Sequence, residues 1–234
     1  MPDLFKGGSM DMSVTPVPHE AASLVWGDCL VNRIAVLVTL VLLLIELKDL
    51  LRLMPFLFRC VSIWKGNMEL EHSVNLARTR NTVSLVMALG FCLVADRWGL
   101  IAPSFKLDLP AEYQLAVTIG IVSGYVILRR LVNLASRFRG FYNEYNSCLR
   151  HSLYNYQILL SVLMILTDLL LVAFRVPYEA GRMVLLVEFG FFALLHLLRS
   201  AQILASRCSI FATILYLCAL EILPLGILVF VSTL

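Results

Sequence analysis

The stretch from Ser152 to Phe174 has the sequence SLYNYQILLSVLMILTDLLLVAF, and its only charged side chain is Asp168. A transmembrane helix needs about 20 predominantly apolar residues, so this stretch is long enough to cross a bilayer. The whole chain of 234 residues is 60% hydrophobic and 15% charged. Soluble domains carry about 25% charged residues. Because the excess apolar residues come in blocks, the composition predicts a helical membrane protein.

Five further apolar windows lie on either side of this stretch, each bounded by charged residues or by the chain end. The six windows are residues 30–45, 81–95, 113–128, 152–174, 183–198 and 208–234. Several are shorter than the roughly 20 residues that span unaided, but flanking aromatic and arginine side chains extend them. We therefore predict an all-α fold, a polytopic membrane helical bundle of about six transmembrane helices. Residues 30–234 form its single domain, and residues 1–29 precede it as a tail.

Lysine and arginine are distributed unevenly among the loops. The loops after the first, third and fifth windows contain 13 of the 19 basic residues. Cytoplasmic loops of membrane proteins carry such an excess of basic residues. We therefore predict that these three loops are cytoplasmic. The N-terminal tail and the C-terminus then lie on the extracytoplasmic side.

Two of these loops mix basic residues with aromatic and aliphatic ones. Residues 47–64 have the sequence LKDLLRLMPFLFRCVSIW, and residues 129–151 have the sequence RRLVNLASRFRGFYNEYNSCLRH. The first predicts a cytoplasmic interfacial helix, broken near Pro55, in the headgroup region. Such segments bind anionic lipid headgroups or a partner protein, unless they only continue the spans as charged helix ends. No RNA-binding motif accompanies them, so we expect no nucleic acid partner.

The third window carries small residues at every fourth position: Ala116, Gly120 and Gly124. Four residues are close to one helical turn, so these residues form one smooth stripe along the helix. Small residues let the backbones of two helices approach closely in lipid. We expect the stripe to be a helix-packing surface, either for another helix of this chain or for another subunit.

Asp168 and Glu188 lie inside the fourth and fifth windows, each about ten residues from the middle of the connection between them. An antiparallel hairpin therefore places them nearly level in the outer half of the membrane. Charges at the bilayer centre cost about 2.5–3.5 kcal/mol, so both should face protein or water. They either share a proton, or each meets a polar group of another helix. His196 lies about 12 Å further along the helix than Glu188, where the two could line one cavity.

The last window, Cys208–Leu234, contains one charged residue, Glu221, at its midpoint. Pro224 follows three residues later and cannot donate a hydrogen bond to the carbonyl of Leu220. The helix should bend there, which leaves a freed carbonyl beside the carboxyl group. We interpret Glu221 and Pro224 as one polar notch at the middle of the membrane. Protons, a partner helix or an internal hydrogen bond could each use it.

Motifs with a catalytic or metal-binding spacing are absent from the sequence. The four histidines form neither HxxxH nor HExxH, and there is no P-loop or GxSxG. The six cysteines lack CxxC spacing, so we expect free thiols rather than a disulfide framework. We therefore expect no cofactor, no bound metal and no catalytic residues, and the chain leans away from being an enzyme.

Three short segments resemble a family of uncharacterised multi-pass inner-membrane proteins of Bacteroidota, a domain-of-unknown-function family. They are LYLCALEILP at 215–224, RHSLYNY at 150–156 and FCLVADRWGL at 91–100. The resemblance implies a bacterial inner-membrane location and no particular reaction. It places Glu221, Pro224, Arg150, His151, Tyr154, Asn155 and Tyr156 on positions of the family's motifs.

These observations favour a non-enzymatic integral inner-membrane protein that is a subunit or scaffold of a membrane assembly. Its expected partners are the lipid bilayer, including anionic headgroups, and other membrane subunits or further copies of the chain. The alternative is a small proton-coupled transporter or channel-like protein that uses Glu221, Asp168 and Glu188 as its relay. A third possibility is a membrane enzyme that acts on lipid, with His151 or His196 as the base.

Overall fold

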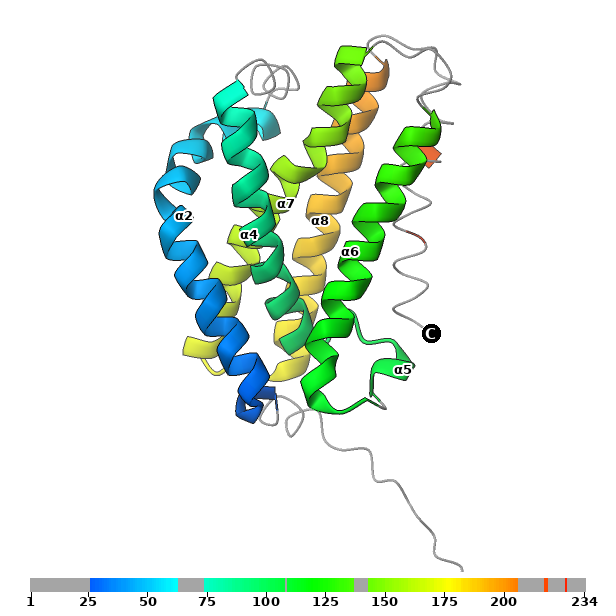
Figure 1. Cartoon of the computed structure of the whole chain (residues 1–234). Helices are drawn as coiled ribbons and strands as arrows, with labels where there is room; N and C mark the ends of the chain where they lie inside the picture. The colour runs from blue at the N-terminus through cyan, green and yellow to red at the C-terminus, as the bar shows by residue number, and fades with distance from the viewer. Residues whose placement is uncertain are drawn as a thin grey trace, which may run out of the picture.

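The computed structural model describes residues 26–62, 74–107, 109–136 and 143–205, together with residues 217, 218 and 226. These parts of the chain are helical and contain no strand. Figure 1 shows the helices in chain order, which are α2 (Leu30–Ser62), α4 (Val74–Arg97), α5 (Ser104–Leu107), α6 (Ala111–Ser136), α7 (Asn143–Ala173) and α8 (Tyr178–Ala205). The all-α fold predicted from the sequence is confirmed.

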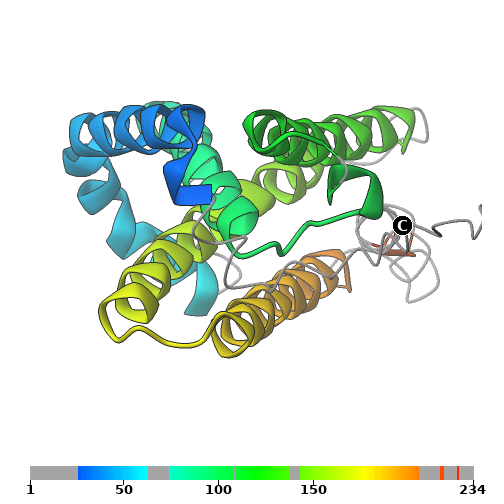
Figure 2. The same cartoon turned by 90° about the horizontal axis from the view of Figure 1, so that it is seen from below.

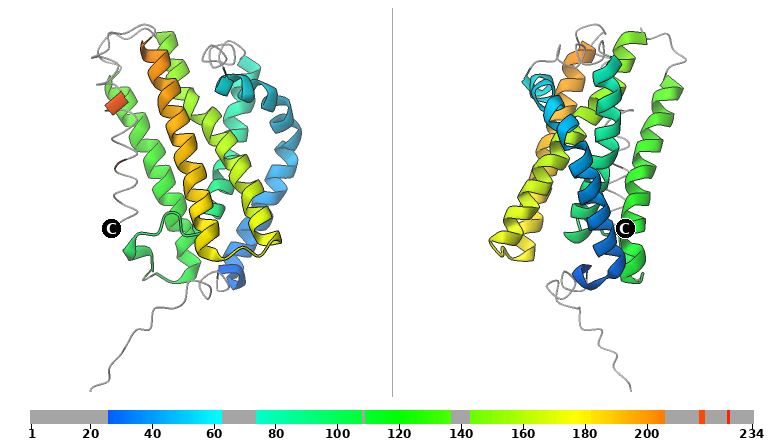
Figure 3. Two further views of the ribbon diagram at one scale, coloured as in Figure 1. Left: turned by 180° about the vertical axis from the view of Figure 1, so that it is seen from behind. Right: turned by 60° about the vertical axis from the view of Figure 1, so that its left-hand side comes forward.

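The five long helices run up and down the bundle in alternation, and short α5 lies at the lower end in Figure 1. α4 packs against α2, α6 and α7, and α8 packs against α7. Seen from below, α2 and α6 lie on opposite sides of α4 (Figure 2). The side views show that each long helix crosses most of the height of the bundle (Figure 3). α4 therefore joins α2, α6 and α7, and α7 connects this group to α8.

Three of the described helices are long and apolar enough to cross a membrane, over Ala111–Leu131, Ser152–Ala173 and Tyr178–Gln202. They contain most or all of the predicted windows 113–128, 152–174 and 183–198. The windows 30–45 and 81–95 lie within α2 and α4, which are not among these three. The last window lies outside the described residues, apart from residues 217, 218 and 226. These three helices are compatible with a membrane protein, and the number of six spans stays a prediction.

α2 continues through Pro55 to Ser62, so the break predicted near this proline is wrong. The helix bends in its upper part, which contains Pro55, without being interrupted (Figure 1). Leu53, Leu57 and Cys60 follow the three- and four-residue spacing of one helix face and are almost fully buried. They belong to a core cluster that includes Met87 of α4 and Ile158 of α7. This packing explains why the chain stays helical despite the hydrogen bond that proline removes.

α4 ends in a Schellman motif at the lower end of the bundle. The N–H of Leu100 donates to the carbonyl of Ala95 at 2.9 Å, and the N–H of Gly99 donates to Asp96 at 3.2 Å. Gly99 has a φ of 55°, which glycine adopts without steric cost. The motif turns the chain directly after Trp98, so the indole ring points into the bundle, where it is 6% exposed.

The ring of Trp98 lies between α4 and the start of α8. It stacks on Tyr178 with ring centroids 5.6 Å apart and an interplanar angle of 17°. Gly181 lies against the same ring, and a Cβ atom added at Gly181 would overlap it. The absence of a side chain at Gly181 therefore determines how closely α8 approaches Trp98.

The variant Gly181→Ala should destabilise the bundle by about 1–3 kcal/mol, because the added methyl group displaces the Trp98 ring. The matched control is Gly190→Ala on the same helix, where an added Cβ has no neighbour within 4 Å among the described residues. That control should be neutral or stabilising, since alanine is the better helix former. The apparent unfolding temperature of both purified proteins in detergent measures the difference. Equal unfolding temperatures would contradict the proposed contact.

Candidate functional site

Asp96, in the last turn of α4, is the centre of a buried polar cluster at the lower end of the bundle. Its Oδ1 lies 2.7 Å from Nζ of Lys106 and accepts a hydrogen bond of 2.7 Å from the hydroxyl of Thr118. Its Oδ2 accepts a hydrogen bond of 2.6 Å from the indole of Trp26. The side chains of Lys106 and Asp96 are only 4% and 1% exposed. Both carboxylate oxygens are thus bonded inside the protein.

Lys106 is satisfied in the same cluster. Besides Asp96, its ammonium group donates to the carbonyl of Ile101 at 3.0 Å and to the hydroxyl of Thr118 at 2.8 Å. These three partners match the three donors of a lysine side chain. A buried charge without such partners would cost several kcal/mol, so the cluster is stable only as a complete set.

Asp168 of α7 is bound to α4 beside this cluster. Its Oδ1 accepts a hydrogen bond of 2.6 Å from the indole of Trp98, and its Oδ2 lies 3.5 Å from a guanidinium nitrogen of Arg97. Arg97 also lies over the ring of Trp26, 5.9 Å from the ring centroid. Arg97, at the end of α4, and Trp98, directly after it, therefore connect α4 to α7. Arg97 also connects α4 to Trp26, which precedes α2.

Glu188 of α8 is bound to a different partner from Asp168. Its Oε1 accepts a hydrogen bond of 3.1 Å from the hydroxyl of Thr167 on α7. Its Oε2 is buried and bonds to none of the described residues. Of the two arrangements that the sequence left open, the structure has the second, in which each carboxyl group meets a polar group of another helix.

His196 lies near the upper end of α8, where it contacts Arg129 of α6. A guanidinium nitrogen of Arg129 is 3.1 Å from Nε2 of the imidazole. Arginine can only donate hydrogen bonds, so this nitrogen accepts and the ring proton is on Nδ1. Both residues are buried, at 4% and 6% exposure. The ring of Tyr156 lies 5.2 Å from the ring of His196 and covers one side of it.

The family-motif positions of α7 lie beside this pair and contact α2 and α6. The hydroxyl of Tyr156 donates to the carbonyl of Cys60 at 3.4 Å, and the amide of Asn155 is 3.8 Å from the Cys60 sulfur. Arg130 donates to the hydroxyl of Tyr154 at 2.7 Å. Arg150 and His151 lie in α7, and their side chains lie outside the described part of the chain.

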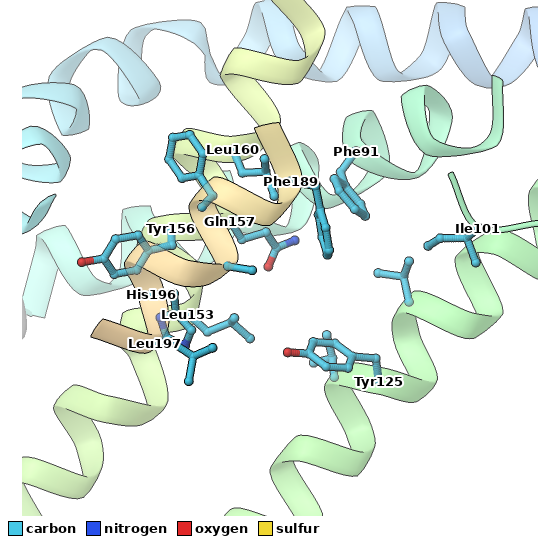
Figure 4. Close-up of a pocket in the computed structure, with 14 residues that line it drawn as sticks. Phe91, Ile101, Tyr125, Leu153, Tyr156, Gln157, Leu160, Phe189, His196 and Leu197 are labelled. Carbon is cyan, nitrogen blue, oxygen red and sulfur yellow. The ribbon is translucent and has the colours of Figure 1, made fainter. Parts of the chain in front are cut away.

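A cavity of about 110 Å³ lies between α6 and α8, with α7 and α4 behind it. Its lower part is apolar and includes Phe91, Ile101 and Val122. Its upper part includes His196 and three further polar side chains, those of Tyr125, Tyr156 and Gln157. Figure 4 shows the amide of Gln157 and the hydroxyl of Tyr125 directed into this space. Glu188 does not line the cavity, so it does not share it with His196 as predicted, and Asp168 does not line it either.

The small-residue stripe of α6 faces outward in the described structure. Ala116, Gly120 and Gly124 are exposed. A Cβ atom added at either glycine has no neighbour within 4 Å among the described residues. Of the two partners that the sequence left open, a helix of this chain is therefore not found among the helices that the structure describes. Glu221 and Pro224 lie outside the described residues.

The described residues contain no group of three or more histidine, cysteine or acidic side chains that could hold a metal ion. Cys29, Cys60, Cys92 and Cys218 form no disulfide, and Cys60 and Cys92 are buried. The buried thiols fill space between apolar side chains, as free cysteines commonly do.

Asp96 and Lys106 had no role predicted from the sequence, and Trp98 and Arg129 were predicted only as flanking interface anchors, yet these four residues anchor the polar contacts. Asp96, Trp98 and Arg129 stand at the ends of apolar windows, where charges and aromatic rings also serve as interface anchors. Lys106 lies in a loop, and only the fold brings it to Asp96. The sequence offered one signal for this polar cluster, which is the run of Asp96, Arg97 and Trp98 directly after an apolar window.

No protein-family model, curated protein or solved structure matches this chain. The resemblance to a family of Bacteroidota thus stays a prediction that rests on its three short segments.

The variant Lys106→Met should destabilise the protein by about 3–5 kcal/mol, because it leaves the Asp96 carboxylate buried without its cation. The double variant Asp96→Asn with Lys106→Met should recover much of this loss. The control is Arg33→Gln, which breaks a pair with Asp28 whose side chains are 64% and 81% exposed. It should change stability by less than about 1 kcal/mol. Unfolding temperatures in detergent test this order, and a harmless Lys106→Met would refute it.

Proposed function

We propose that the protein is a non-enzymatic integral membrane protein that serves as a subunit or scaffold of a membrane assembly. The observation that carries this proposal is that the acidic side chains within the bundle, one buried and two partly buried, bond to other elements of the fold. Asp96, Asp168 and Glu188 each bind a side chain of another element. Such bonds hold helices together in lipid. The bundle is thus braced for a fixed shape, which is what a scaffold needs.

The outward face of α6 supports the same proposal. Its stripe of Ala116, Gly120 and Gly124 is exposed and has room for close approach. A stripe of this kind in a membrane helix is suited to a partner helix. We further propose the bacterial inner membrane as the location, with the upper end of the bundle in Figure 1 facing the cytoplasm. The excess of lysine and arginine in the loops at that end supports this orientation.

A proton-coupled transporter is the alternative, and the geometry favours it less. A relay needs ionisable groups that share a water-accessible path. Asp168 and Glu188 lie apart from the cavity lining. The lipid-enzyme alternative is weaker still, since the contacts of His196 with Arg129 and Tyr156 offer a candidate base neither a nucleophile nor a metal.

Purification of the full chain from its membrane in a mild detergent should recover either a stoichiometric membrane partner or a homo-oligomer. Gly120→Leu with Gly124→Leu should abolish that complex, because leucine side chains keep the backbones apart. The unfolding temperature of the variant should stay unchanged. Native mass spectrometry gives the stoichiometry of both complexes.

The matched control is Gly190→Leu, at an exposed glycine of α8 that is equally open. It should leave the complex intact. Recovery of the protein alone and monomeric in several mild detergents would overturn the proposal. Loss of proton-coupled flux in Glu188→Gln, with unchanged assembly and stability, would favour the transporter instead.

A further inference from the structure

The cavity between α6 and α8 lies where these two helices pack against different neighbours. α6 packs against α4, and α8 packs against α7. At the upper end, α6 and α8 meet through the contact between Arg129 and His196. At the lower, apolar end, the rings of Phe91 on α4 and Phe189 on α8 lie 6.1 Å apart and are tilted by 33°. The cavity between these contacts is therefore bounded by packed side chains, as preformed ligand sites are.

One polar side chain in the lining has its hydrogen-bonding groups directed into this space. Figure 4 shows the amide of Gln157 there. Tyr156 and His196 also line the cavity, but they bond to Cys60 and Arg129 respectively. The amide of Gln157 makes no hydrogen bond to the described part of the chain, and only the backbone carbonyl of this residue accepts one. A bound molecule that bonds to the amide is favoured, because an unpaired amide beside apolar side chains is costly.

The character of the lining favours an uncharged ligand with a hydroxyl group. The described lining residues include no lysine, arginine or carboxylate, and His196 is already in contact with Arg129. A charged group among apolar side chains is costly unless an opposite charge pairs with it. A hydroxyl group both donates and accepts, so it can use the carbonyl and the NH₂ of the Gln157 amide. A carbonyl compound could use only the NH₂.

The volume of the cavity limits the apolar part of the ligand. It is about 110 Å³, which is less than the roughly 150 Å³ of an apolar cavity that accommodates one benzene molecule. Benzene has six carbon atoms, so a cavity of this size holds about four in proportion. The ligand that fits is therefore a short chain, and the long chains of membrane lipids do not fit.

We infer that this cavity binds a neutral short-chain alcohol of about four carbon atoms. Its hydroxyl group bonds to the amide of Gln157, and its alkyl chain lies against the rings of Phe91 and Phe189. This site is independent of the small-residue stripe of α6, because Ala116, Gly120 and Gly124 are not among the residues that line the cavity.

Photolabelling of the purified full chain in nanodiscs tests the site. The probe is a butanol analogue that carries a diazirine on its chain. Labelling should saturate in the millimolar range, as expected for so small a ligand, and should map to lining residues of α6, α7 or α8. Butanol should displace the probe, whereas butyrate and butylammonium should not, because a charged group has no counter-charge in the lining.

A series of alcohols measures the size of the site, with the free concentration in water as the reference. Each added CH₂ group should strengthen displacement about threefold to fourfold from ethanol to butanol, because each buries more apolar surface. Octanol should displace no better than butanol, because its longer chain exceeds the volume of the cavity.

Three variants locate the site. Ala193→Phe fills the cavity, since Ala193 lines it, and should abolish labelling. Gly190→Phe on the same helix is the matched control and should label normally. Gly190 is exposed, and an added Cβ there has no neighbour within 4 Å among the described residues.

Gln157→Leu tests the hydrogen bond. The native chain should prefer butanol to chlorobutane, which has no hydroxyl group, and the variant should lose a preference of about threefold or more. A purely structural role of Gln157 would not change the ratio of the two displacement constants. Unfolding temperatures identify any variant that fails to fold, and the measurements on the native chain do not depend on the variants.

Labelling that maps outside the cavity, or no saturable labelling of the native chain, would overturn the inference. Displacement that strengthens steadily up to octanol would overturn the predicted size of the ligand. Displacement by butyrate or butylammonium would overturn its neutrality, and an unchanged preference for butanol in Gln157→Leu would overturn the role of Gln157. None of these results bears on the complex that the α6 stripe is proposed to form.

Discussion

The burial of Asp96 is the constraint on which the rest of the structure depends. A carboxylate in an apolar interior needs a bonding partner for each oxygen, because neither lipid nor packed side chains supply one. Lys106, Thr118 and Trp26 meet that need, and they come from three different parts of the chain. Their positions fix α6, the α4–α6 connection and the start of α2 relative to α4. One buried charge thereby specifies the mutual placement of several helices.

The apolar windows predicted the helices well, since a helix long enough to cross a bilayer can be recognised from local composition alone. The sequence also predicted two possible arrangements for Asp168 and Glu188. One of them is the arrangement found, in which each carboxyl group bonds to another part of the bundle. The Asp96–Lys106 pair and the Arg129–His196 contact escaped prediction because their partners are brought together only by tertiary packing. The outward orientation of the α6 stripe could not be predicted for the same reason, because periodicity identifies a helix face but not what packs against it.

The polar side chains are arranged differently at the two ends of the bundle. At the lower end the polar groups bond to one another, and at the upper end His196 and its neighbours border open space. The lower end holds α6 and α8 in place, since Lys106 of α5 bonds to Thr118 of α6 and Tyr178 of α8 stacks on Trp98. The cavity between these helices is a result of that placement.

The spacing of the polar partners along the chain also has a consequence for biogenesis. Lys106 and Thr118 follow Asp96 by 10 and 22 residues, so this carboxylate acquires its partners almost as soon as the α4 segment is synthesised. Asp168 is 71 residues beyond Arg97 and is synthesised much later. The α4–α6 unit is therefore expected to form first during translation, and α7 docks onto an assembled surface. The positions of the charged residues along the chain therefore set the expected order in which the helices assemble.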